Sequence, residues 1–391
     1  MDTRRARSTL LASCTVHFLH DGCAELLYPL FPIWAREFGL SFAQVGLLRS
    51  GYSGALAAFQ IPAGFLAERY GETRILVAGT LLTAIGFLTL GTAAGFATLL
   101  AFLILGGLGS GTQHPLASAL VSRAYEEGPR RAALGTYNFS GDLGKIVWTS
   151  LAAFLAAWVG WRWATRGIGS LILLSAFGLL AVLGAMLSGP AEGTGASHTR
   201  VKQTDWGIRD AGGFRLLATI HGIDNGSRTA FLTFLPFLLI GKGMRVELTG
   251  VALALTLAGG ATGKFVCGII AERLGIIRTV ILTEAATGLG ILLVMVIPYR
   301  PALIVLPLLG IALNGTSSVL YGTVAELVHP ERRSRVYGLF YTIGIGAGAV
   351  APPIFGTLSD WTNLSVTLVV LSLIVLAILP LAAALQKSVA R

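Results

Sequence analysis

The sequence predicts an all-α integral membrane protein with twelve transmembrane helices, arranged as two pseudo-symmetric bundles of six. Three observations support this prediction. Hydrophobic residues make up 54% of the chain and charged residues only 12%, whereas a soluble domain is about 25% charged. Apolar runs of about 20 residues, the length needed to cross a bilayer core, recur along the whole chain. An eleven-residue phrase also occurs twice, once in each half.

The apolar runs divide the chain into six spans on either side of one polar segment. The spans cover residues 8–35, 45–68, 75–93, 96–122, 132–158, 162–187, 213–240, 247–271, 277–297, 301–328, 334–358 and 363–386. Residues 188–212 are rich in Gly, Ser and charge, as a linker should be. We therefore expect an N-terminal bundle over 1–187, a cytoplasmic linker over 188–212 and a C-terminal bundle over 213–391.

The repeated phrase is GFLAERYGETR at 64–74 and GIIAERLGIIR at 268–278, 204 positions apart. The same offset aligns three further pairs in the first span of each half: His17 with His221, Asp21 with Asn225, and Pro32 with Pro236. An offset of 203 then aligns Gly135 with Gly338. The chain therefore contains an internal duplication, with an insertion or deletion of one residue between the two halves.

Both copies of the phrase follow the pattern Gly-x-x-x-acid-Arg-x-Gly-x-x-Arg between two spans. Gly64 and Gly268 remove side chains where two helices must approach closely, and Gly71 and Gly275 permit tight turns. The remaining positions place charges at the cytoplasmic membrane edge, where they could form a latch that breaks and re-forms: Glu68, Arg69, Arg74, Glu272, Arg273 and Arg278. The alternative is a basic loop that only fixes topology.

The distribution of Lys and Arg predicts the orientation of the chain. Most of the 29 basic residues fall at the N-terminus, in alternate loops and at the C-terminus, which places both termini in the cytoplasm. Topology and anionic lipid account for the formal net charge of +10, so no nucleic-acid partner is needed. The three cysteines form neither a CxxC pair nor a disulfide framework.

Polar residues recur inside the spans, where an ionisable group costs about 2.5–3.5 kcal/mol. In the first span, His17, Asp21, Glu25 and Tyr28 are spaced by four, four and three residues, so they form one stripe on a helix. The seventh span carries a matching stripe, in which the acid and the arginine are spaced to pair: His221, Asp224, Asn225 and Arg228. We expect both stripes to face a shared cavity.

Other spans add polar groups at depth: His114, Asn138, Asp142, Lys145, Lys264 and Asn314. Asp142 and Lys145 lie three apart and can neutralise each other, which lowers the cost of burying either. Purely structural roles stay open for these residues. His17 could be a core histidine bonded to a carbonyl, and Asp142–Lys145 could be a structural ion pair.

The chain resembles the major facilitator superfamily, and the repeated loop resembles that superfamily's signature between helices 2 and 3. Within it, the chain is similar to fosmidomycin-resistance-type efflux proteins at short motifs: HFLHD at 17–21, YPL at 28–30, EFGLS at 37–41, GSG at 109–111, HP at 114–115, AEL at 325–327 and GLF at 338–340. The resemblance implies two bundles around a central cavity, alternating access, and export driven by inward proton movement across a bacterial inner membrane.

We therefore predict a secondary active transporter for a small polar, anionic or zwitterionic molecule, working as a proton-coupled antiporter with a role in antibiotic resistance. Asp21, helped by Glu25 and His17, would exchange protons, while Lys145, Arg228 and Lys264 would attract the substrate. The fifth span lacks the Gly-Pro signature of many drug exporters, which leaves a proton-coupled uptake symporter of a small organic acid open. A metal or metal-chelate exporter is a further alternative.

An enzyme is not expected. His17 and His20 diverge on a helix, no third strong ligand cluster accompanies them, and no nucleophile assembly stands out. We expect no cofactor besides the proton gradient and no bound metal. The expected partners are the small-molecule substrate, protons and the lipid bilayer, with the chain working as a monomer; a receptor or scaffold on the same fold is the remaining rival.

Overall fold

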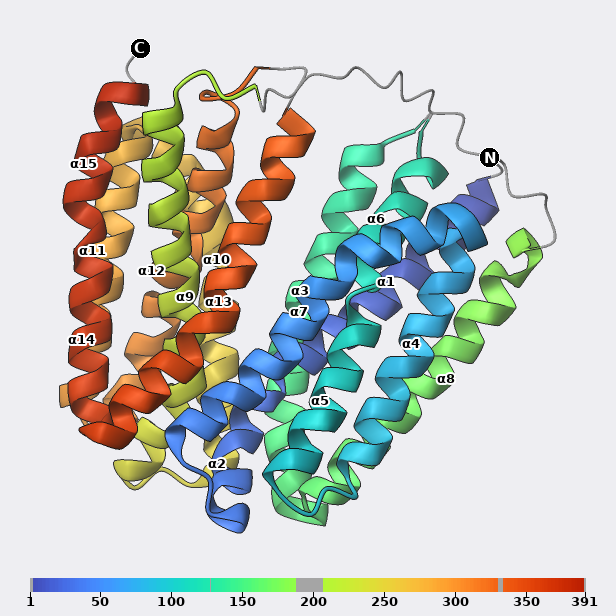
Figure 1. Ribbon diagram of the computed structural model, residues 1–391, viewed down its shortest axis with the longest axis horizontal. Coiled ribbons are helices and arrows are strands. Elements are labelled where there is room, and N and C mark those ends of the chain that lie inside the picture. The colour runs from blue at the N-terminus through green and yellow to red at the C-terminus, as the bar shows by residue number, and fades with distance from the viewer. Residues whose placement is uncertain (1–2, 127, 188–206, 330–332, 390–391) are drawn as a thin grey trace. The chain divides into compact units, whose positions relative to one another are not determined.

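The computed structural model describes residues 3–126, 128–187, 207–329 and 333–389 of the 391-residue chain, and this part folds into fifteen helices (Figure 1). They are α1 (Thr3–Glu25), α2 (Leu27–Phe38), α3 (Phe42–Tyr70), α4 (Glu72–Leu90), α5 (Phe96–Ser110), α6 (Gln113–Ala124), α7 (Arg130–Val159), α8 (Trp161–Leu187), α9 (Ala211–Gly241), α10 (Val246–Leu274), α11 (Ile276–Val296), α12 (Tyr299–Val324), α13 (Arg333–Trp361), α14 (Leu364–Leu376) and α15 (Ile378–Val389).

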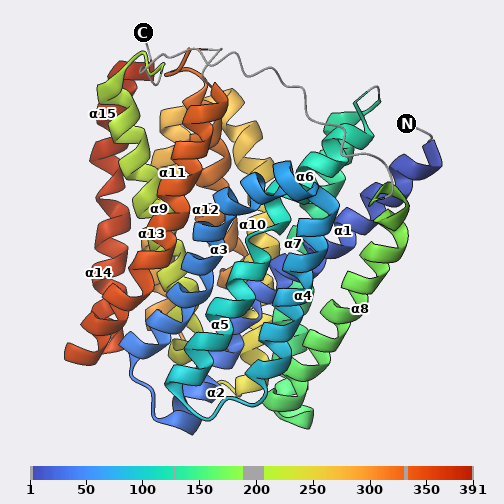
Figure 2. The ribbon, with the colours of Figure 1, turned by 45° about the vertical axis from the view of Figure 1, so that its right-hand side comes forward.

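The fifteen helices form the twelve predicted spans, because three spans are each divided into two helices. α1 is followed directly by α2, α5 by α6, and α14 by α15, and Figure 2 shows α15 continuing the line of α14. At Leu26 and Ala377 the backbone N–H still bonds four residues back, to Gly22 O and Leu373 O at 2.9 Å each, so these breaks are local. The predicted all-α, twelve-span class is confirmed.

The apolar surface of the helices suits a bilayer. Nine segments of the described chain are long and apolar enough to cross a membrane, and the spans outside this group are α1–α2, α3 and α9. α1 and α9 are the helices that carry the predicted polar stripes. Large apolar side chains such as Trp158, Phe177, Leu289 and Ile304 are exposed, as expected where lipid replaces water.

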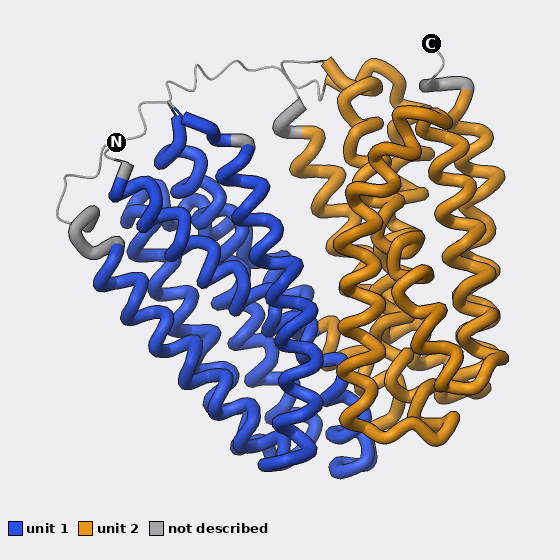
Figure 3. The backbone as a smooth tube through the Cα atoms, turned by 180° about the vertical axis from the view of Figure 1, so that it is seen from behind, with its two compact units in different colours: residues 1–39, 51–199 blue, residues 40–50, 200–391 orange. Residues whose placement is uncertain are grey.

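The chain divides into two compact units, coloured separately in Figure 3. Unit 1 comprises residues 1–39 and 51–199, and unit 2 comprises 40–50 and 200–391, so the first turns of α3 group with unit 2. Each unit has its own apolar core, around Leu76 and Val121 in unit 1 and around Leu217 and Leu320 in unit 2. Most of the predicted linker, 188–206, lies outside the described residues, and the domain boundaries stay a prediction.

Glycines allow α1 and α7 to pack closely in unit 1. A Cβ atom at Gly144 would overlap the carbonyl of Phe18, and one at Gly22 would overlap the ring of Trp148. One turn before Gly144, a Cβ at Gly141 would meet the imidazole of His17. The close approach therefore brings the polar face of α1 directly against α7.

Candidate proton and substrate site

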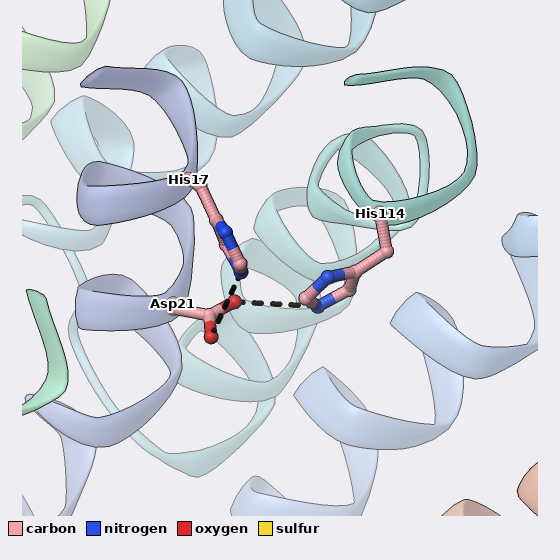
Figure 4. Close-up of side chains that lie close together, drawn as sticks. All are labelled: His17, Asp21 and His114. Atoms are coloured by element: carbon pink, nitrogen blue, oxygen red, sulfur yellow. Dashed lines mark ion pairs between the residues drawn. The ribbon is translucent and has the colours of Figure 1, made fainter. Parts of the chain in front are cut away.

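Three basic side chains from three helices converge on one carboxylate in unit 1. His17 Nε2 lies 3.2 Å from Asp21 Oδ2, His114 Nε2 lies 3.2 Å from Asp21 Oδ1, and Lys145 Nζ lies 3.0 Å from Asp21 Oδ2. Figure 4 shows both imidazole rings directed at the Asp21 carboxylate. Asp21 is only 7% exposed, so these contacts replace the water that a charged group needs.

The local sequence explains how each group arrives there. His17 and Asp21 are four apart on α1 and share a face. His114 stands in the first turn of α6, directly after the break from α5. Lys145 extends from α7 and also donates to Asp142 Oδ1 at 3.3 Å. The His114 and Lys145 side chains are 30% and 28% exposed, so the group that we call the Asp21 cluster (His17, Asp21, His114, Asp142 and Lys145) is not fully buried.

The hydrogen bonds of His17 fix where a proton must sit. Its Nδ1 lies 2.8 Å from the carbonyl oxygen of Tyr137, and because a carbonyl only accepts, Nδ1 carries a hydrogen. Without a further proton, the Nε2 lone pair would face the Asp21 carboxylate at 3.2 Å and repel it. With a proton on either His17 Nε2 or Asp21 Oδ2, the 3.2 Å contact is a hydrogen bond.

His20, which the helical spacing placed off the stripe, has a different environment. Its Nδ1 lies 3.1 Å from Ser110 Oγ and its Nε2 lies 3.3 Å from Thr80 Oγ1. Tyr52 completes this group through a 2.8 Å bond between its hydroxyl and Ser110. Hydroxyls can donate or accept, so a neutral His20 is fully satisfied as a buried core residue.

The stripe of α9 in unit 2 is arranged differently from that of α1. His221 is fully buried and stacks on Phe340 with a centroid distance of 4.2 Å. Arg228 Nη1 donates to Asn314 Oδ1 at 3.1 Å. Oδ2 of Asp224, the predicted partner of Arg228, has no hydrogen-bonding partner among the described residues.

The remaining predicted cavity residues lie apart from the contacts of the Asp21 cluster, except Glu25, whose charge acts on Lys145. Tyr28 is buried in α2, edge-on to Phe31, and Asn138 is exposed on α7. Glu25 and Asn225 are half-buried, and so is Lys264, whose carbonyl accepts a 3.3 Å bond from Ser318.

Sequence reasoning missed two acids. Glu284 is 1% exposed near the middle of α11, and its signal was available as the one carboxylate in the apolar run 277–297. Glu72, directly after the first copy of the repeated turn glycine, forms an ion pair with Arg123 of α6. Neither acid has a partner at helical spacing on its own helix, which is the pattern that revealed the two stripes and the Asp142–Lys145 pair.

The repeated loops show the predicted turns but not the predicted close approach. Gly71 and Gly275 have φ angles of +91° and +85° and precede α4 and α11 directly, a conformation that favours glycine. A Cβ at Gly64 or Gly268, however, would meet nothing within 4 Å, so no neighbouring helix needs these glycines in this arrangement.

The charges of the two loops point into open surroundings. Their six side chains are exposed, and no ion pair joins them in the part of the chain that the structure describes: Glu68, Arg69, Arg74, Glu272, Arg273 and Arg278. Arg69 instead lies over the ring of Tyr70, 5.2 Å from its centroid. A latch built from these charges remains a prediction.

His17, Asp21 and His114 also offer three possible metal ligands whose donor atoms lie within 4.8 Å of one another. The ammonium of Lys145, 3.0 Å from the same carboxylate, places a positive charge where a cation would bind. A metal would have to displace it, so the donor set fits a proton better than a metal.

The sequence model of the Major Facilitator Superfamily matches residues 13–209 and 217–389, nearly the whole described chain. This chain belongs to the Major Facilitator Superfamily. It is therefore a multi-pass membrane transporter and not an enzyme.

Its relatives in the superfamily carry different names. The fosmidomycin resistance protein of Escherichia coli is 23% identical over 93% of this chain and 89% of its own. A probable sulfoacetate transporter of Cupriavidus necator is 25% identical over 85% and 82%. The inward-facing, unoccupied crystal structure of a bacterial homologue of the human lysosomal transporter Spinster matches with a TM-score of 0.81, 17% identity, and coverage of 100% and 98%. At that identity the structural likeness supports the fold alone.

Proposed function

We propose that this transporter exports a small zwitterionic or anionic molecule in exchange for protons, and that the Asp21 cluster binds both. The observation that carries the proposal is the convergence of His17, His114 and Lys145 on one buried carboxylate. A charged group this deep in a membrane protein is costly and marks a substrate or ion pathway. The partial exposure of His114 and Lys145 gives a ligand access to it.

The proton step uses the pair of His17 and Asp21. With one proton on the pair, the charges of Asp21, Asp142 and Lys145 and of that proton sum to zero. Removing the proton leaves the cluster with one net negative charge, and the Nε2 lone pair of His17 then opposes the carboxylate. Loss of the proton must be compensated by another positive group, which is the condition for exchange.

A zwitterionic substrate supplies that group. Its cationic end would replace the proton beside Asp21, and its anionic end would bind the Lys145 ammonium, which has hydrogens beyond those that it donates to Asp21 and Asp142. Substrate and proton then compete for one carboxylate, so one leaves as the other binds. The likeness to a protein named for fosmidomycin resistance favours export.

A second candidate function follows from the same geometry. Protonation of Asp21 weakens its ion pair with Lys145 and frees the ammonium for an anion, so proton and anion would bind together. This favours uptake of an organic acid by symport, and a sulfoacetate transporter and a gallate transporter are among the relatives. The two functions predict opposite proton movements on substrate binding.

The test measures that movement directly. The purified full-length chain is mixed in weakly buffered detergent with the zwitterion glycine or with the anions fosmidomycin, sulfoacetate or gallate, and a pH-sensitive dye records protons released or taken up. Exchange predicts release and symport predicts uptake. In proteoliposomes with an imposed pH gradient, Asp21→Asn should reduce coupled flux at least about tenfold, since a charge-assisted hydrogen bond contributes about 1.5–3 kcal/mol.

The matched control is Glu247→Gln, another carboxylate-to-amide change, at an acid that forms an exposed ion pair with Arg245 at the start of α10, in the other unit. It should leave both measurements unchanged. Proton release and coupled flux that survive in Asp21→Asn at the level of the unmodified protein would overturn the proposal, whichever substrate is bound.

A further inference from the structure

Unit 2 buries two acids from different helices beside each other. Asp224 of α9 is 3% exposed and Glu284 of α11 is 1% exposed, and their carboxyl groups lie close enough to interact directly. Thr316 of α12 lies beside Glu284, but its hydroxyl hydrogen points to Thr283 Oγ1 at 2.7 Å.

Three of the four carboxyl oxygens lack hydrogen-bonding partners among the described residues. Oδ2 of Asp224 and both oxygens of Glu284 are buried without a hydrogen-bonding partner in the described part of the chain. Burying a carboxylate without hydrogen-bonding partners costs free energy. A second negative charge this close raises that cost for both groups. One proton between the two carboxyl groups removes the repulsion and supplies an O–H donor for the missing bond.

The surroundings supply too little positive charge for two carboxylates. Arg228, one turn along α9, is the cation that acts on both acids, and its Nη1 already donates to Asn314. His221 lies one turn earlier on α9, and Tyr321 of α12 contacts the His221 ring and interacts with Asp224. α14 has no ionisable side chain, and Lys264 of α10 is not among the groups that act on the pair.

The internal repeat shows that the fold does not require acids here. The offset of 204 residues aligns Asp224 with His20 and Glu284 with Thr80. In unit 1 these two side chains meet as well, through the 3.3 Å contact between His20 Nε2 and Thr80 Oγ1. The same position in the bundle thus holds a neutral, satisfied pair in one unit and an unsatisfied acid pair in the other.

We infer that Asp224 and Glu284 form a second proton-binding site, which holds one proton between the two carboxyl groups inside unit 2. This site deepens the proposed proton coupling, although its existence does not depend on the direction of transport or on the Asp21 cluster. Its ligand is the proton itself, and Arg228 stabilises the single negative charge that remains.

Infrared difference spectroscopy of the purified full-length protein tests the site without any transport assay. A protonated carboxyl group gives a C=O stretching band, distinct from that of a carboxylate, which shifts in D₂O. We expect the unmodified protein to show such a band at neutral pH, and Glu284→Gln to lose it. Asp21→Asn is the matched comparison, because it alters the other proposed proton site and should leave the band of the acid pair in place.

A second variant keeps the test decisive if Glu284→Gln folds poorly. Asp224→His combined with Glu284→Thr installs in unit 2 the pair that unit 1 already packs, so it should fold and lose the band. A band that persists in either folded variant would overturn the second site. A band that is lost while Asp21→Asn still couples transport would retain the second site and reject the proposed function instead.

Discussion

The two units pack a buried histidine in the same way, against an aromatic ring and a glycine, and we call this arrangement the histidine frame. The groups around the frame differ between the units. In unit 1, His17 stacks on the ring of Tyr137 at 4.2 Å, and in unit 2, His221 stacks on Phe340 at the same distance. Each imidazole also fills the space of a missing side chain, at Gly141 and at Gly344. These residues align at offsets of 203 and 204, so the frame itself is duplicated.

The charges around that frame are not duplicated. Asp21 aligns with Asn225, and Lys145 aligns with Gly348, so the ion pairs that surround His17 have no counterpart around His221. Both ring nitrogens of His221 lack partners among the described residues. Unit 2 instead places its acids at the positions of His20 and Thr80. The difference teaches that packing alone maintains the repeat, because unit 2 keeps the same packing without these charges. The buried charges are therefore not needed for the fold, and their presence indicates a function.

The largest expected effect comes from Lys145→Met. This change leaves Asp21 and Asp142 without their shared ammonium, and removing one partner of a buried ion pair costs about 3–5 kcal/mol. Thermal unfolding in detergent should show a large loss of stability, and coupled flux should disappear.

The comparison also predicts a rescue. Combining Lys145→Met with Asp21→Asn gives unit 1 the uncharged character that unit 2 has at these two positions. Part of the stability should return, because Asp21 no longer carries an unpaired charge while Asp142 still does, and transport should stay absent. A double variant as unstable as Lys145→Met alone would mean that the charges, and not the shared packing, hold unit 1 together.

An intermediate effect is expected from alanine at the two glycines. A Cβ at Gly141 or at Gly344 would overlap the histidine ring of its own unit, and overpacking of this kind costs about 1–3 kcal/mol. Unfolding of the two single variants should show similar losses. A loss confined to one of them would break the proposed equivalence of the two frames.

The sequence predicts the fold well because the features that define this fold can be read along the chain. Apolar run length gives the twelve spans, and the repeated phrase gives the two halves. The breaks at Leu26 and Ala377 each lie three residues before a proline, Pro29 and Pro380, which has no N–H to donate to the carbonyl four residues back. The sequence therefore carries a signal for both breaks, although apolar run length does not show it.

The candidate site is predicted only where it depends on a single helix. Spacing by four residues identifies His17 and Asp21 as neighbours, because it fixes their angle on α1. It cannot show that His114 and Lys145 reach the same carboxylate, since helical period says nothing about which helices meet. The pairing of Glu284 with Asp224 is not predicted for the same reason, because the two acids lie on different helices.

The smallest expected effect concerns the ion pair between Glu72 and Arg123. Arg123 is 50% exposed, and pairs of this kind contribute about 0–1 kcal/mol. Unit 2 has Ile276 in place of Glu72, so the helix after the turn glycine begins there without an acid. Glu72→Ile should therefore lower the unfolding midpoint slightly or not at all, with proton-coupled flux retained. A loss as large as that of the glycine variants would show that this pair, at the start of α4, carries a role that its counterpart in unit 2 has lost, and the charge difference between the units would then extend beyond the buried sites to the ends of the helices.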